Sequence, residues 1–246
     1  MSGHSHWARI KRKKGATDVK KGKLFSKLAR QVIMAARGGR DPDHNIALRY
    51  ALDAAREASM PRDSIDRAVE KGAGGGAGTE FESVVYEGYG PGGVAISVEA
   101  LTDNRNRTSG EVRGIFEEHG GNLGATGCVG WLFEKKGVIN VPATGTTEDK
   151  LLEIAIDLGA ENIERIEDEF AVTVAPESFE KMRQALAKAG HKPASAAVQK
   201  IPKSTVAVAG DDARRILALL SKLEEHDDVS DVAANSEIPD ELLNET

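Results

Sequence analysis

The chain has 246 residues, and its hydrophobic (40%) and charged (29%) fractions are ordinary for a water-soluble globular protein. No apolar run approaches the ~20 residues that span a bilayer, and the charged N-terminus argues against a secretory signal, so we expect a cytoplasmic protein with no membrane partner. The single cysteine, Cys128, excludes an internal disulfide and a multi-cysteine zinc site.

Positive charge is concentrated at the start of the chain. Residues 1–40 contain twelve lysines and arginines and one acid, Asp18, which gives a net charge of +11. The whole chain has 33 basic and 39 acidic residues, so residues 41–246 contain 21 and 38 and carry a net charge of −17. Such asymmetry within one chain predicts that the N-terminal end binds a polyanion.

A polar, basic arm over residues 2–16 precedes the first predicted helix, 18–37. The arm has no apolar stripe, and we expect a partner to order it. The helix is predicted because apolar side chains recur at spacings of three and four residues, which places them on one helical face. These side chains are Leu24, Phe25, Leu28, Val32 and Ala36.

Two further helices complete a small N-terminal domain. They are predicted over 43–59 and 62–71, and Pro61 separates them because proline cannot continue a helix. A glycine-rich linker follows at 72–79. We therefore expect residues 1–78 to hold the arm, a three-helix domain and the linker.

The rest of the chain has element orders typical of ferredoxin-like α+β sandwiches. One copy is expected within 136–201, with strands 138–141, 162–166, 170–175 and 195–200 and helices 147–158 and 177–189. A second copy is expected to be split across 79–135 and 202–246. This split copy is expected to follow a strand at 84–86. Its strands are predicted at 94–101, 128–133, 204–209 and 229–234, and its helices at 107–119 and 211–225. A turn is predicted at 135–137. The predicted fold class is therefore α+β, with a three-helix domain followed by two ferredoxin-like domains, the second inserted in the first.

The last 23 residues, 224–246, contain nine acids and no lysine or arginine. This composition predicts a solvated, partly disordered tail. Because its charge is opposite to that of the arm, we also expect that the tail folds back and masks the arm.

Clustered cations in the arm and first helix are candidate phosphate contacts, because each neutralised phosphate releases a condensed counterion. Trp7, with His4 and His6 nearby, is expected to stack on an exposed base. The alternative is a basic tail that only aids solubility. No zinc-finger spacing or RNP signature appears, so shape and phosphate recognition is favoured over base readout, and DNA and RNA stay equally open. The candidate cations are Arg9, Lys11, Arg12, Lys13, Lys14, Lys20, Lys21, Lys23 and Lys27.

A second candidate contact joins a predicted strand to a predicted helix. Asn104, Arg105, Asn106 and Arg107 lie beside the helix N-terminus, which is a suitable place to bind an anion or a phosphate backbone. The alternative is a capping loop with a surface arginine pair, in which an asparagine or Thr108 caps the helix. The sequence does not separate these two interpretations.

Catalytic chemistry is not expected. His119 and Cys128 lack a third orienting group, and the acidic run 167–169 is typical of a solvated turn. We therefore predict no enzyme activity, no small-molecule substrate and no cofactor. If Met1 is removed, the new N-terminus with Gly3 and His4 has the ligand set of a square-planar Cu(II) or Ni(II) site, although coincidence is the favoured explanation.

Seven stretches resemble the YebC family, which includes the mitochondrial translational activator of cytochrome c oxidase subunit I. They are Gly3–Ala8, Gly22–Lys27, Met60–Pro61, Tyr86–Gly93, Thr102–Thr108, Gly120–Gly124 and Glu237–Asp240. His6 and Arg9 stand where the family commonly has Lys and Asn, and 232–237 lacks the usual Tyr and Phe.

The resemblance implies a three-part α+β protein without catalytic activity. Its members are described as cytoplasmic, DNA-binding transcriptional regulators. They are also linked to translation, where they relieve ribosome stalling at proline runs, which would make rRNA, tRNA and ribosomal proteins the partners. The resemblance carries the basic arm and the 104–107 loop over as candidate contacts and leaves the choice between DNA and the ribosome open.

Overall fold

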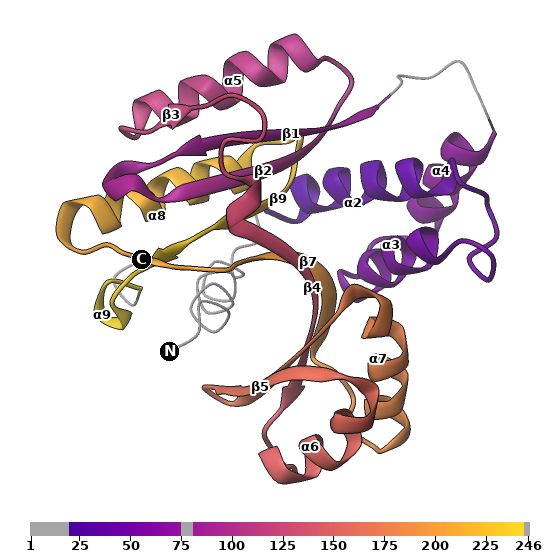
Figure 1. Ribbon diagram of the computed structural model, residues 1–246. Coiled ribbons are helices and arrows are strands. Elements are labelled where there is room, and N and C mark those ends of the chain that lie inside the picture. The colour runs from indigo at the N-terminus through magenta and orange to yellow at the C-terminus, as the bar shows by residue number, and fades with distance from the viewer. Residues whose placement is uncertain (1–19, 75–80, 244–246) are drawn as a thin grey trace. The chain divides into compact units, whose positions relative to one another are not determined.

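The computed structural model describes residues 20–74 and 81–243 (Figure 1). The chain divides into two compact units. The first, which we call the N-terminal unit, holds the described residues up to Cys128 together with Gly210–Val232. The second, the inserted unit, holds Val129–Ala209 and the segment from Ala233. The finer division into three domains stays a prediction.

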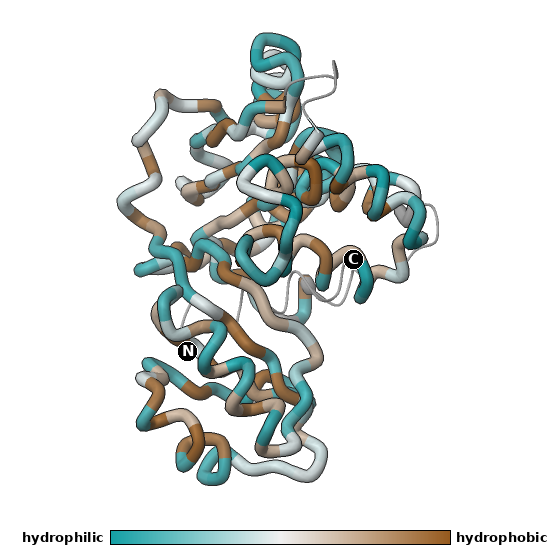
Figure 2. Tube along the Cα trace, turned by 90° about the vertical axis from the view of Figure 1, so that its right-hand side faces the viewer, coloured by the Kyte–Doolittle hydropathy of each residue, from teal (hydrophilic) through white to brown (hydrophobic). Residues whose placement is uncertain are grey.

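Three helices open the N-terminal unit, as the sequence predicted: α2 (Lys20–Ala36), α3 (Ile46–Glu57) and α4 (Arg62–Ala73). The predicted start of the linker at 72 was wrong, because Gly72 and Ala73 lie inside α4. The Asn45 side chain accepts a hydrogen bond from the Leu48 N–H and caps α3. In Figure 2, hydrophobic residues recur along these helices between hydrophilic ones, as expected of helices with one buried face. The buried faces form one core of Leu28, Val32, Ile33, Ala36, Leu48, Leu52, Ala55, Met60, Ile65 and Ala68.

A four-stranded sheet follows in the same unit. Its strands are β1 (Glu82–Tyr89), β2 (Ala95–Thr102), β3 (Asn122–Leu123) and β9 (Val229–Ala234), in the order β3-β1-β2-β9. β1 and β2 pair antiparallel, and the connecting turn, η1 (Pro91–Gly93), ends in two glycines with positive φ. β2 and β9 also run antiparallel, since Leu101 donates to the Asp228 carbonyl and Ser230 donates to the Glu99 carbonyl.

Helices α5 (Arg105–Glu118) and α8 (Gly210–Glu225) pack on this sheet. Gly88 and Gly90 are two residues apart in extended chain, so side chains at both positions would point to the same face of the sheet. Their contacts show that both helices cover this face. A Cβ on Gly88 would lie 2.9 Å from Phe116 of α5, and a Cβ on Gly90 would lie 2.5 Å from Ile216 of α8. Because both positions lack a side chain, the helices approach the sheet closely.

The inserted unit contains the second sheet, with strands β4 (Phe133–Pro142), β5 (Ala160–Ile166), β6 (Glu169–Val174) and β7 (Ser195–Pro202). The order is β5-β6-β4-β7, and all neighbouring strands run antiparallel. Helices α6 (Glu148–Ala155) and α7 (Phe179–Lys188) follow β4 and β6. This is the strand–helix–strand–strand–helix–strand order of a ferredoxin-like sandwich, so the predicted fold of this region is confirmed, while the domain bounds 136–201 stay a prediction.

Shorter elements complete this unit. β8 (Val206–Ala207) pairs in parallel with β10 (Ser236–Glu237), and α9 (Asp240–Leu243) lies near the end of the described chain. Turns of 3₁₀ helix occur at η2 (Gly130–Leu132), η3 (Ile156–Leu158) and η4 (Pro176–Ser178). Within the described residues, no helix is long and apolar enough to cross a membrane.

The split copy differs from its prediction in its third strand. The expected strand 204–209 is reduced to β8, which pairs with β10 and not with the first sheet. β1 lies beside β2 in its place. The α+β class holds, but the strand assignment within the first sheet was wrong, because the sequence order of strands does not determine which strands pair.

The expected strand 128–133 and the turn 135–137 were also wrong. Residues 130–132 form the 3₁₀ turn η2, and β4 begins at Phe133 and continues through Lys135 and Lys136. Gly137 does not break the strand. A Cβ there would lie 2.6 Å from the ring of Phe179, so the glycine allows α7 to pack closely on β4.

The prediction of a solvated tail was wrong for the middle of 224–246. Val232, Asn235, Ser236 and Ile238 are buried, and residues 229–234 form β9. The strand predicted over 229–234 is confirmed, and it completes the edge of the first sheet beside β2.

Candidate nucleic-acid interface

The structure describes part of the predicted phosphate-binding set. Trp7, Arg9, Lys11, Arg12, Lys13, Lys14 and the candidate metal ligand His4 lie outside the described residues, and so do the side chains of Lys20 and Lys21. Their roles stay predictions. The N-terminal unit brings the remaining candidates together: Lys23 and Lys27 lie on α2, and residues 104–107 lie at the start of α5.

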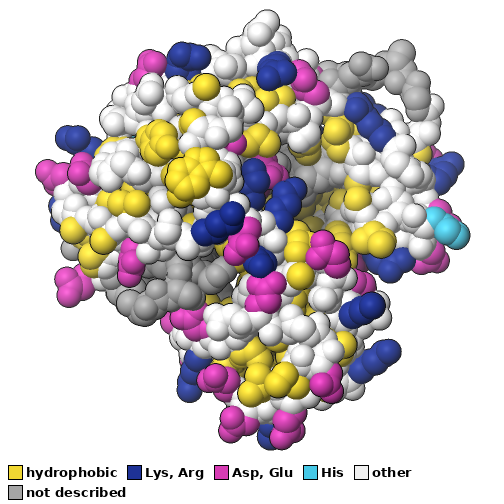
Figure 3. Space-filling view, in the orientation of Figure 1, with side chains coloured by type: hydrophobic (Ala, Val, Ile, Leu, Met, Phe, Trp, Pro, Cys, Tyr) yellow, Lys and Arg dark blue, Asp and Glu magenta, His cyan; other side chains and the backbone are white. Residues whose placement is uncertain are grey.

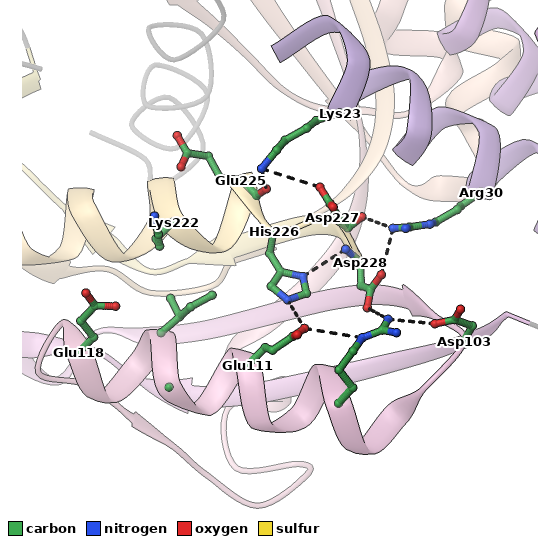
Figure 4. A pocket seen from close by; sticks show the side chains of 13 residues that line it. Lys23, Arg30, Asp103, Glu111, Glu118, Lys222, Glu225, His226, Asp227 and Asp228 are labelled. Atoms are coloured by element: carbon green, nitrogen blue, oxygen red, sulfur yellow. Dashed lines mark hydrogen bonds and ion pairs between the residues drawn. The ribbon is translucent and has the colours of Figure 1, made fainter. Parts of the chain in front are cut away.

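Three cations of α2 contact the end of α8, and Figure 4 shows two of them, Lys23 and Arg30. Lys23, Lys27 and Arg30 are spaced by four and three residues, so they share one helical face. Lys23 Nζ lies 3.4 Å from the Glu225 carbonyl oxygen and 3.9 Å from the Asp227 carboxylate. Lys27 donates to the Glu224 carbonyl, and Arg30 donates to the Asp227 carbonyl.

These carbonyls lie at and just beyond the C-terminus of α8, where the last backbone oxygens of a helix lack intrahelical partners and the helix dipole is negative. The α2 cations therefore act as capping groups for α8. Burial lowers the pKa of Lys27, against the opposing charges of Glu224 and Asp227. The contact thus carries a desolvation cost at this lysine.

Asp228 is the centre of the charged network. Its side chain is 4% exposed and lies 3.0 Å from Arg30 and 2.6 Å from Arg107. The Thr108 hydroxyl donates to it at 2.6 Å, and the Thr102 hydroxyl lies at 3.3 Å. Burial alone would raise the pKa of Asp228, but the hydrogen bonds from Thr108 and Arg107 and the charge of Arg30 together lower it. Asp228 is therefore an ionised, hydrogen-bonded group that holds four elements together.

The 102–108 loop caps helix α5, which is one of the two interpretations that the sequence allowed. Asn104 accepts a hydrogen bond from the Arg107 N–H at 3.1 Å, so Asn104 is the N-cap of α5. The Arg107 side chain pairs with Asp103 at 2.9 Å and with Asp228, and these hydrogen bonds raise its pKa. Arg105 and Asn106 are exposed. The anion-binding role of this loop stays a prediction.

A groove of about 710 Å³ lies between α2, α5 and the α8–β9 turn. Six acids and four cations line it, so the groove is net negative. In Figure 3 cationic and acidic side chains are likewise interspersed on the face shown. In this arrangement the α2 cations face carbonyls and carboxylates, so phosphate does not have ready access to them. The lining charges are Lys23, Arg30, Asp103, Arg107, Glu111, Glu118, Lys222, Glu225, Asp227 and Asp228.

Glu111, His226 and Asp228 are the described residues whose ligand atoms lie close enough together to hold a metal ion. The Asp228 N–H donates to Nδ1 of His226, which assigns the proton of a neutral imidazole to Nε2. Nε2 then donates to Glu111 at 2.9 Å. Both ring nitrogens are engaged within the protein, and Arg107 already pairs with both carboxylates, so the arrangement is an ion-pair network and not a preformed metal site.

Sequence reasoning missed Arg30, Asp228 and His226. Arg30 had a usable signal, because it continues the spacing of Lys23 and Lys27 on α2. Asp228 had none in its own neighbourhood, since its four donors come from α2, from the end of β2 and from the start of α5. Only the three-dimensional pairing of β2 with β9 brings these segments together.

Known proteins match the whole chain. Residues 5–75 match the family described as the TACO1/YebC protein N-terminal domain, and residues 81–236 match the TACO1/YebC second and third domain. Curated relatives from Dictyoglomus turgidum and Pelotomaculum thermopropionicum, each named probable transcriptional regulatory protein, are 50% and 51% identical to it. These alignments cover 99% and 98% of this chain and 98% and 100% of theirs.

A solved structure agrees with the fold. The crystal structure of a conserved hypothetical protein from Aquifex aeolicus has a TM-score of 0.86 and 50% identity, and the match covers 95% of this chain and 97% of that one. Full-length identity near 50%, matches to both family regions and the shared fold lead to one conclusion. The chain belongs to the TACO1/YebC family.

Proposed function

We propose that the chain is a non-enzymatic, nucleic-acid-binding regulator of gene expression and that it acts on DNA as a transcriptional regulator. One observation carries the proposal: residues 1–40 have a net charge of +11, whereas the remaining residues have −17. A polyanion is attracted to the first segment and repelled by the second. The names of the curated relatives, probable transcriptional regulatory protein, support the same class of function.

In this proposal the arm makes the first phosphate contacts, and α2 extends them because it follows the arm directly in the chain. Arg105 and Asn106 are exposed at the start of α5 and supply a second contact. Recognition relies on phosphates and shape, and sequence preference comes from the deformability of the duplex and not from base edges.

The acidic body favours a second candidate, a translation factor on the ribosome. A surface of −17 is repelled along most of a long polyanion, which suits a protein that inserts one basic end into a crevice of rRNA or beside tRNA. The same surface complements basic ribosomal proteins. In this role the chain would relieve stalling at difficult sequences such as proline runs.

Binding as a function of salt, together with sedimentation, separates the two candidates. A DNA regulator is expected to bind duplex DNA with a steep salt dependence and to prefer one sequence by a factor that survives added salt. A translation factor is expected to co-sediment with ribosomes and to leave that fraction when Lys11, Arg12, Lys13 and Lys14 are neutralised. Failure to bind duplex DNA, single-stranded RNA and ribosomes at low salt would overturn the proposal.

A further inference from the structure

The latch, which we define as Lys23, Lys27 and Arg30 of α2 together with residues 224–228, joins the helical region to the α8–β9 turn. Two of its three cations, Lys23 and Lys27, are residues that the sequence assigns to phosphate. In the structure all three donate to backbone carbonyls of 224, 225 and 227. These acceptors carry only the partial charge at a helix C-terminus, about half an elementary charge in total. A phosphate carries a full negative charge, so it is a stronger partner than a carbonyl for Lys27. Lys23 and Arg30 also pair with the carboxylates of Asp227 and Asp228.

The latch is polar, whereas the other face of α2 is apolar. Leu28, Val32 and Ala36 pack with α3 and α4 in a core of the helical region, and α2 makes its most extensive contacts with those two helices. On the α8 side, the latch contacts are the cation–carbonyl bonds and the ion pairs of Lys23 and Arg30. Polar surfaces between the parts of a chain favour relative movement. The helical region therefore keeps its own core when the latch opens.

Opening leaves the buried carboxylate of Asp228 satisfied. When Arg30 departs, Arg107, Thr108 and Thr102 still surround it. The freed carbonyls lie at the end of a helix, where water replaces the lost donors. Lys27 also regains solvent, which removes the desolvation that lowers its pKa in the closed latch. The groups on both sides therefore have partners in the open state.

We infer that the latch face of α2 is a cryptic phosphate-binding surface, closed by the carbonyl end of α8 and opened when nucleic acid replaces those carbonyls. The inference rests on the proposed function and names the partner of α2 as the phosphate backbone. The arm binds first and holds the nucleic acid near the start of α2, so the exchange becomes intramolecular and gains effective concentration. Asp227 and Asp228 mask α2 while no nucleic acid is bound.

Cross-linking of the full chain tests this exchange. The variant carries Lys23→Cys, Glu225→Cys and Cys128→Ser and is joined by a short bismaleimide, and the same variant capped with N-ethylmaleimide is its open reference. A control cross-link joins Glu117→Cys of α5 to Arg214→Cys of α8, which line another cavity of the same unit and do not separate when the latch opens. Binding to fluorescent duplex DNA and to single-stranded RNA is measured from low to moderate salt.

Compared with the capped protein, the cross-linked protein is expected to bind duplex DNA more weakly. The slope of log affinity against log salt is expected to be about 1.8 less steep, because Lys27 and Arg30, the two latch cations that remain, no longer reach phosphates. The control cross-link leaves the slope unchanged, and duplex DNA slows formation of the latch cross-link. Equal slopes for the cross-linked and capped proteins overturn the cryptic surface while the proposed function stands. If the capped protein binds neither duplex DNA, single-stranded RNA nor ribosomes at low salt, the proposed function fails and the cryptic surface fails with it.

Discussion

The guanidinium of Arg30 lies 3.0 Å from the carboxylate of Asp228, and this ion pair joins α2 to the turn before β9. The Asp228 side chain is almost fully buried, and Arg107 and Thr108 also donate to it. The stability of the N-terminal unit and the accessibility of the α2 cations therefore depend on the same carboxylate.

Replacing Asp228 with Ala is expected to destabilise the N-terminal unit by about 3 kcal/mol, because it removes a buried charge and leaves its donors unmatched. Chemical denaturation followed by circular dichroism measures the change. Glu70→Ala, at an exposed acid of α4, is the control and is expected to cost less than about 0.5 kcal/mol. Equal losses in the two variants would contradict the central role of Asp228.

Acid is expected to remove the same stabilisation. The pKa of Asp228 is lower in the folded state than its ordinary value, so the unfolded chain binds more protons in this range and stability rises with pH. The contribution is complete above the ordinary carboxyl pKa and disappears as pH falls through the folded-state pKa. The difference in unfolding free energy between the wild type and Asp228→Asn should therefore shrink toward low pH. A difference that stays constant from pH 7 to pH 2 would show that ionisation of Asp228 does not contribute.

Two glycine-to-alanine changes are expected to have opposite signs. A Cβ on Gly72 of α4 would lie 2.3 Å from the Ile33 carbonyl and 2.7 Å from Ala36, so Gly72→Ala should separate α2 from α4 and cost about 1–3 kcal/mol. A Cβ on Gly110 of α5 meets nothing within 4 Å, so Gly110→Ala should stabilise by roughly 0.5–1 kcal/mol through helix propensity. Thermal unfolding of both variants checks this, and a stabilising Gly72→Ala would disprove the close approach of α2 and α4.

Replacing each of the two asparagines of the 104–107 loop with Ala is expected to lower stability by different amounts. Asn104 caps α5, so Asn104→Ala should cost about 1 kcal/mol of stability. Asn106 is exposed within the first turn of the helix, and Asn106→Ala should change stability by less than about 0.5 kcal/mol. Urea denaturation distinguishes the two variants. A larger loss at Asn106 than at Asn104 would be inconsistent with this assignment of the cap.

Local signals predicted much of the fold. The spacing of Leu28, Val32 and Ala36 places α2, and the order of elements in 136–201 predicts the ferredoxin-like sheet that the structure has. The first sheet was harder because β9 joins β2 over a long sequence distance, as the hydrogen bond from Ser230 to Glu99 shows, whereas β1 and β2 form a local hairpin. The sequence shows β1 as a strand joined to β2 by a short glycine-rich turn, but its order of elements also favoured 204–209 as a strand of the same sheet.

The candidate interface shows the same limit. Asn104 and Arg107 were identified by their position before a helix, whereas their network depends on Asp228, which is distant in sequence. The charges of Lys23 and Lys27 are visible in the sequence, but their partners are backbone carbonyls at the end of α8. Any helix end offers such carbonyls whatever its side chains, so sequence cannot indicate which helix end they will meet.

The salt dependence of duplex DNA binding by an arm-neutralised chain tests the central claim most directly. The variant replaces Arg9, Lys11, Arg12, Lys13 and Lys14 with Gln, and its control replaces five exposed cations of the body, Arg113, Lys150, Lys181, Lys188 and Lys192, with Gln. If the arm is the polyanion-binding end, the arm variant should lose about 4.5 from the slope of log affinity against log salt, and the control should lose almost none. An unchanged slope in the arm variant, or an equal loss in the control, would contradict that claim.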